Sequence, residues 1–91
     1  MKIKILIVEA DNEYARILGS AFSPDLFDVD VAINGKDAQL KCYKRKYAVV
    51  ILDIMVKNNS SIEVLKYLRT NFPSVKIIFT TADLEYLDQI G

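Results

Sequence analysis

Short apolar runs alternate along this chain with amphipathic segments that have a helical period. In chain order, runs and segments occupy residues 3–8, 11–22, 27–32, 34–45, 48–52, 60–71 and 75–80, and residues 83–90 resemble the start of a further helix. Strands that alternate with helices are joined by right-handed crossovers and therefore run parallel. The sequence thus predicts an α/β fold, with helices on both faces of a doubly wound parallel sheet.

The four apolar runs differ in a way that predicts their places in the sheet. Residues 3–8 and 48–52 are nearly continuous in Ile, Leu and Val, which is typical of strands covered on both faces. Residues 27–32 (FDVDVA) alternate apolar and acidic side chains, which favours an outer strand with one wet face. We therefore expect residues 3–8 and 48–52 to be central.

Capping residues mark the starts of the three helical segments. Asp11 or Asn12 is placed to cap the first, Asn34 with Asp37 to begin the second, and Ser60 has capping-box spacing to Glu63 at the third. The positions expected to face the core are Ala15, Leu18, Phe22, Ala38, Leu40, Cys42, Ile62, Leu65 and Leu68.

Composition excludes several classes of function. The chain contains no histidine and one cysteine, Cys42, so it cannot build a Cys/His zinc site or use a catalytic histidine. Its 12 basic and 12 acidic residues give no net charge, which argues against direct binding of nucleic acid by this domain. No apolar run approaches the roughly 20 residues that cross a bilayer, and the N-terminus lacks the pattern of a signal peptide. We expect a cytoplasmic domain with no membrane contact.

Polar residues follow three of the predicted strands. Glu9 and Asp11 follow the first, Asp53 the third, and Thr80 and Thr81 end the fourth. A parallel sheet forms its binding crevice at the carboxyl ends of its strands, so these groups are expected to converge. Clustered carboxylates repel one another unless a divalent cation such as Mg²⁺ neutralises them. Such a site suits transfer of a phosphoryl group onto a carboxylate.

The chain resembles the response-regulator receiver domains of two-component signalling. Four segments carry the resemblance in the family's order and spacing: KIKILIVEAD, NGKDAQLKCYKRKYAVVILDIMV, SIEVLKYLR and KIIFTTA. The family has a flavodoxin-like fold with strand order 2-1-3-4-5. The resemblance implies that Asp53 accepts a phosphoryl group from a histidine kinase or phosphotransfer protein. It also implies that Thr81 is the switch hydroxyl, and that Glu9 and the Met55 backbone carbonyl contribute to an Mg²⁺ site.

The sequence departs from the family pattern at the metal site and at the C-terminus. Ala10 replaces the carboxylate that binds the metal directly, so Mg²⁺ binding is in doubt, and Asp11 is either a substitute ligand or a helix cap. Lys57 stands where the family usually has a proline, and Ser61 stands where it usually has a glycine. Residues 1–91 end before the family's fifth strand and its lysine. We expect an incomplete domain with strand order 2-1-3-4, without the fifth strand and last helix.

Three interpretations follow for function. The first is a signalling domain, not an enzyme, that is phosphorylated on Asp53. The second is a pseudo-receiver that mediates protein–protein contacts without phosphorylation, which Ala10 and the missing lysine favour. A small phosphotransferase or nucleotide-binding enzyme is disfavoured, because the chain has no glycine-rich phosphate loop. In either of the first two cases, the apolar fourth strand is expected to be an open edge through which the chain forms homo-oligomers.

Overall fold

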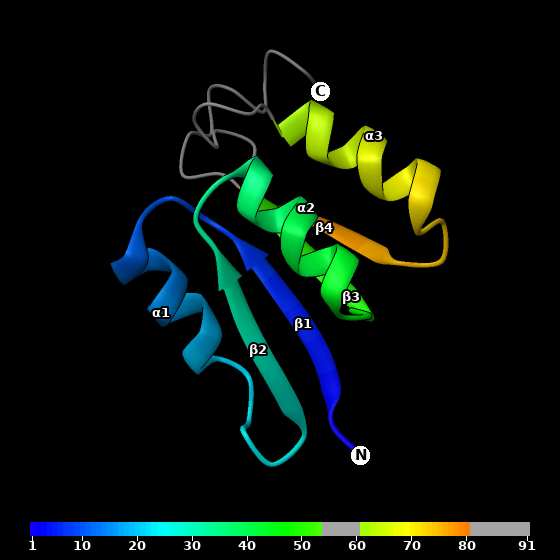
Figure 1. Cartoon of the computed structure of the whole chain (residues 1–91). Helices are drawn as coiled ribbons and strands as arrows, with labels where there is room; N and C mark the ends of the chain where they lie inside the picture. The colour runs from blue at the N-terminus through cyan, green and yellow to red at the C-terminus, as the bar shows by residue number, and fades with distance from the viewer. Residues whose placement is uncertain (54–60, 81–91) are drawn as a thin grey trace.

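A parallel sheet with the strand order β2-β1-β3-β4 forms the centre of the structure (Figure 1). The computed structural model describes residues 1–53 and 61–80. Its strands are β1 (Ile3–Val8), β2 (Phe27–Ala32), β3 (Val49–Asp53) and β4 (Lys76–Thr80), and its helices are α1 (Asn12–Ser20), α2 (Gly35–Lys44) and α3 (Ser61–Asn71). The predicted fold class and strand order are confirmed. The helix expected over residues 83–90 lies outside the described residues.

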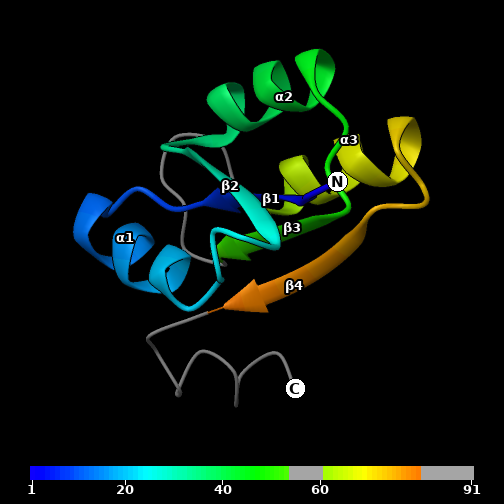
Figure 2. The same cartoon turned by 90° about the horizontal axis from the view of Figure 1, so that it is seen from below.

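Helices cover both faces of the sheet, with α1 on one face and α2 and α3 on the other (Figure 2). The alternating side chains of β1 supply both layers, as expected of a central strand. Ile5 and Ile7 pack in the cluster that contains Ala15 of α1. Leu6 and Val8 pack in the cluster formed with α2 and α3. All four side chains are essentially inaccessible to solvent, so β1 is fixed from both sides.

The register of the strands aligns their carboxyl ends. Val8 of β1 lies opposite Leu52 of β3, and Leu52 lies opposite Phe79 of β4. The residues that follow Val8 and Leu52 therefore reach the same edge of the sheet. The polar residues that follow the predicted strands were expected at this edge.

Two of the predicted core positions are wrong. Leu40 is 52% exposed and Ile62 is 58% exposed. The buried side of α3 contains Ser61, Val64 and Leu68, a spacing of three and four residues. Ile62 lies about 100° around the helix from Ser61, because an α-helix has about 3.6 residues per turn. Leu40 lies two residues from Ala38 and two from Cys42, and therefore about 200° around α2 from each of these buried positions. The remaining expected positions are buried or half-buried, although α1 ends at Ser20, before Phe22.

A polar cluster ties the outer strand β2 to the connection between α2 and β3. The Asp30 carboxylate accepts hydrogen bonds from the Arg45 guanidinium and from the Tyr47 hydroxyl, each at 2.6 Å. Partial burial opposes ionisation of Asp30, but the donors Tyr47 and Arg45 outweigh it and hold the pKa of Asp30 below its usual value. Asp30 is therefore a carboxylate that accepts hydrogen bonds from two side chains, and not simply a solvent-exposed residue of an outer strand.

We predict that Tyr47→Phe lowers the free energy of unfolding by about 1–2 kcal/mol, because it removes a hydrogen bond to a charged acceptor at a buried side chain. Urea denaturation at neutral pH measures the change. Tyr43→Phe is the matched control, since Tyr43 is 80% exposed and should change stability little. Equal effects of the two substitutions would contradict a stabilising role for the Asp30–Tyr47 contact.

Candidate functional site

Two acidic residues lie side by side where β1 and β3 end. Glu9 follows β1 directly, and its backbone N–H donates to Ala32 O at 2.9 Å. Asp53 is the last residue of β3. Glu9 is only 4% exposed and Asp53 is half-buried. The pairing of β1 with β3 thus brings together Glu9 and Asp53, which were predicted from the sequence to converge.

The two oxygens of Glu9 have different surroundings. Oε1 accepts a hydrogen bond from the Asp11 N–H at 3.1 Å. Oε2 is buried and has no hydrogen-bond donor within reach among the described residues. When Glu9 and Asp53 are both ionised, neither carboxylate can donate to the other, whereas a protonated Glu9 can donate to Asp53. Burial, followed by this interaction with Asp53, raises the pKa of Glu9 to about 7, although the Asp11 N–H opposes the shift.

Asp11 occupies the N-cap of α1. Its Oδ1 accepts hydrogen bonds from Glu13 N at 2.9 Å and from Tyr14 N at 3.1 Å. Both N–H groups belong to the first turn, where they have no partner within the helix. Of the two roles left open for Asp11, capping is therefore observed, and one of its oxygens is already engaged. Ala10, between Asp11 and Glu9, is exposed.

Thr80 lies opposite Asp53 in the register of β3 and β4. Its Oγ1 is a second buried polar atom that has no hydrogen-bond partner within the described ranges. Its neighbour Thr81 matches the position of the switch hydroxyl in the family. Thr81 and Met55 both lie outside the described residues. The strand register is the signal that identifies Thr80 as an additional site residue, since paired residues of adjacent strands project to the same face.

The comparisons with known proteins identify the family. Residues 5–90 match the family model of the response regulator receiver domain.

The chain belongs to the response regulator receiver domain family.

The relatives include a response regulator and a transcriptional regulatory protein. The receiver domain is 31% identical over 88 residues to response regulator ArlR of Staphylococcus saprophyticus, which covers 97% of this chain and 40% of ArlR. It is 33% identical over 87 residues to the transcriptional regulatory protein CpxR homolog of Haemophilus influenzae, covering 96% of this chain and 37% of the relative. The chain therefore spans about two fifths of the length of these relatives.

Solved structures of receiver domains resemble this one closely. Response regulator TrrA from Thermotoga maritima, in complex with Mg²⁺-BeF, superposes with a TM-score of 0.85 at 31% identity, covering 99% of this chain and 77% of that one. A Francisella response regulator receiver domain gives a TM-score of 0.81 at 26% identity, covering 98% and 74%. Within residues 1–53 and 61–80, no helix has the length and apolar character needed to cross a bilayer.

The donor set at this edge fits Mg²⁺ through two carboxylates. In the described ranges, no three acidic, cysteine or histidine residues form a group that could hold a metal ion. Mg²⁺, however, is commonly bound by one or two carboxylates together with water and phosphate oxygens. Glu9 offers a buried oxygen without a donor, beside the carboxylate of Asp53. A cation between the two carboxylates would reduce their repulsion and would also be a partner for the Glu9 Oε2 atom.

We predict that the stability of the receiver domain declines between about pH 4.5 and 7 because of Glu9. The folded chain holds the Glu9 proton more tightly than the unfolded chain, so its contribution is full below pH 4.5 and is lost as the pH rises through about 7. The decline should be on the order of 2–3 kcal/mol. Urea denaturation across this range measures it, without added Mg²⁺.

Glu9→Gln should remove this decline, because the amide does not titrate. Glu13→Gln is the control: Glu13 is exposed, so the decline should persist. A wild-type profile that matches that of Glu9→Gln across this range would contradict the proposed environment of Glu9.

Proposed function

We propose that this receiver domain accepts a phosphoryl group on Asp53 from a phosphohistidine of a sensor kinase or phosphotransfer protein. The observation that carries the proposal is the pairing of Asp53 with Glu9, whose buried Oε2 lacks a donor in the described part of the chain. One carboxylate is placed to react and the other to hold a cation beside it. Family membership supports the same assignment.

The reaction forms one bond and breaks another. An Asp53 carboxylate oxygen attacks phosphorus and the P–N bond to the donor breaks. The donor, protonated on its other ring nitrogen, leaves as neutral imidazole, and an acyl phosphate forms on Asp53. Asp53 belongs to a central strand whose preceding residues are buried, so its backbone is held in place during the transfer. Positioning of this kind lowers the barrier without requiring a catalytic acid.

Glu9 and Asp53 are the residues proposed to hold Mg²⁺, with Asp11 and the Met55 carbonyl as further oxygen donors. Bound Mg²⁺ neutralises negative charge on the carboxylates and on the phosphoryl oxygens. TrrA, at 31% identity, carries Mg²⁺ together with a beryllofluoride group, and this supports the proposal by similarity. Thr81 is proposed as the hydroxyl that contacts the phosphoryl group. Thr80, the last residue of β4, offers a second hydroxyl.

A phosphorylation-independent pseudo-receiver is the second candidate. Ala10 supplies no ligand, and one Asp11 oxygen is engaged in capping α1. These two observations weaken the metal site without affecting the fold. In this case the domain acts as a protein–protein interaction module.

We predict that incubation with acetyl phosphate and Mg²⁺ gives a single phosphoryl adduct, detected by intact mass. Asp53→Asn should abolish the adduct, because the amide oxygen is a poor nucleophile. Omission of Mg²⁺ should reduce the yield strongly. Asp25→Asn, at an exposed residue, is the matched control and should react like the wild type. A folded wild-type domain that forms no adduct would favour the pseudo-receiver instead.

We also propose that the domain self-associates through β4. Within the described ranges, no strand pairs with the outer edge of β4. Ile78 is 51% exposed and Phe79 is 46% exposed, and the two side chains project to opposite faces of the sheet. An apolar edge strand of this kind is a template for pairing with a second chain.

We predict a concentration-dependent dimer in sedimentation velocity at tens of micromolar protein, a rough working range. Ile78→Lys should shift the equilibrium towards monomer, because a charge on an edge strand discourages pairing. Ile17→Lys is the control: Ile17 is 53% exposed but lies on α1. A monomer at all concentrations, or equal effects of the two lysines, would exclude this interface.

A further inference from the structure

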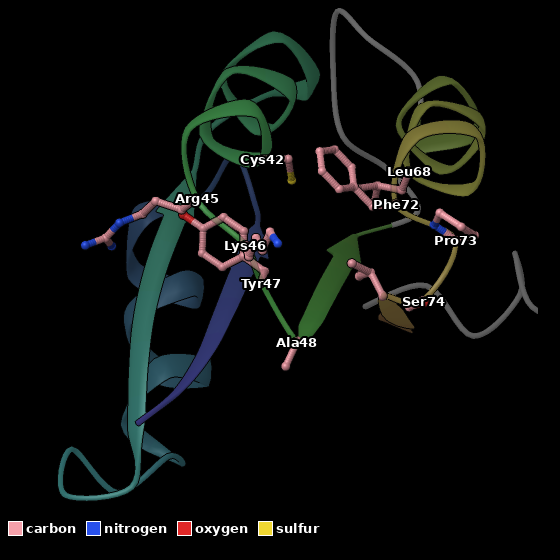
Figure 3. A pocket seen from close by; sticks show the side chains of 10 residues that line it. Cys42, Arg45, Lys46, Tyr47, Ala48, Leu68, Phe72, Pro73 and Ser74 are labelled. Carbon is pink, nitrogen blue, oxygen red and sulfur yellow. The ribbon is translucent and has the colours of Figure 1, made fainter. Parts of the chain in front are cut away.

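A cavity of about 380 Å³ lies at the end of the sheet opposite the acidic pair (Figure 3). Ala48 and Val75 line it just before β3 and β4 begin, whereas Glu9 and Asp53 stand where β1 and β3 end. Its other walls come from the C-terminal parts of α2 and α3 and the segments that follow them. The cavity is thus separate from the proposed phosphorylation site.

The interior of this cavity is apolar. Cys42 and Leu68, which are 5% and 1% exposed, lie at its inner side. In Figure 3 the Tyr47 side chain stands on the α2 side and Phe72 on the α3 side. A volume of this size falls in the lower part of the range of small-molecule sites, which are mostly apolar with a few placed polar groups.

Hydrogen bonds hold both sides of the cavity in place. On the α3 side, the Arg69 guanidinium donates to Val75 O at 2.8 Å and so fixes the connection from α3 to β4. On the α2 side, the Tyr47 hydroxyl donates to Asp30 at 2.6 Å. A ligand would therefore enter a largely preformed space and order few side chains, which favours binding.

The described charged residues at the rim are all positive. Arg45 and Lys46 are the charged residues that line the cavity, and Lys2 and Lys4 line an adjoining hollow that shares Lys46. Arg45 points away from the cavity in Figure 3 and pairs with Asp30. Lys46 is exposed and forms no ion pair with a carboxylate in the described ranges. Among residues 1–53 and 61–80, no acidic residue lines either hollow.

We propose that this cavity binds a small monocarboxylate with an aromatic or branched apolar body. The apolar body occupies the space between Tyr47, Leu68 and Phe72, and the carboxylate faces Lys46 at the rim. The assignment of an anion rests on charge complementarity, because every charged residue of the described part of the chain that lines the cavity or its adjoining hollow is cationic.

The test titrates the ¹⁵N-labelled receiver domain with 4-phenylbutyrate and separately with 4-phenylbutan-1-ol, which has the same body without the charge. Amide signals of residues 45–48, 72, 74 and 75 should shift with the carboxylate, and the alcohol should bind more weakly. Lys46→Gln should weaken binding of the carboxylate about threefold to fivefold, as expected for one exposed charge pair. Lys44→Gln is the matched control, an exposed lysine that does not line the cavity, and should leave the affinity unchanged.

Ala48→Leu supplies a second, independent variant. Ala48 is exposed and lines both the cavity and the adjoining hollow, so the larger side chain should occupy space at their shared rim without disturbing the core, which a well-dispersed amide spectrum would verify. Binding should be weakened in this variant. Equal affinities for acid and alcohol, equal effects of the two glutamine substitutions, or undiminished binding to a folded Ala48→Leu would each overturn the proposal. None of these outcomes depends on phosphorylation of Asp53.

Discussion

Parallel pairing of the buried strands β1 and β3 determines the chemistry of this domain. Each strand is held by apolar packing on both faces, and their register leaves no freedom in where they end. Glu9 and Asp53 are therefore kept together although two ionised carboxylates at this distance repel each other. The free energy of core packing, and not any attraction within the site, maintains a pocket that favours a proton or a cation.

Much of this arrangement could be predicted from the sequence. The continuous apolar runs that became β1 and β3 identified central strands, and the alternating run that became β2 identified an outer one. Asp11 was correctly placed at a helix start, because side-chain capping depends only on local spacing. The convergence of Glu9 and Asp53 followed from the rule that parallel strands share a carboxyl edge. The roles of Thr81 and Met55 stay predictions, since both lie outside the described residues.

The features that sequence reasoning missed depend on tertiary packing. Leu40 and Ile62 have apolar side chains on helices, but which face of a helix is buried depends on its rotation against the sheet. Asp30 lies 15 residues from Arg45 and 17 from Tyr47 in the sequence, and their cluster forms only once β2 lies beside the α2–β3 connection. Thr80 was expected at the carboxyl edge, but only the strand register pairs it directly with Asp53; the switch role was assigned to Thr81 from the family position.

The pairing of Glu9 with Asp53 is tested most directly by ¹³C-detected NMR titration of the Glu9 side-chain carboxyl. The expected pKa of Glu9 is about 7 in the wild-type domain. Asp53→Asn should move that pKa back towards the ordinary value, because it removes the neighbouring charge and proton acceptor. A Glu9 carboxyl that titrates near 4.5 and is insensitive to Asp53→Asn would contradict the shared pocket.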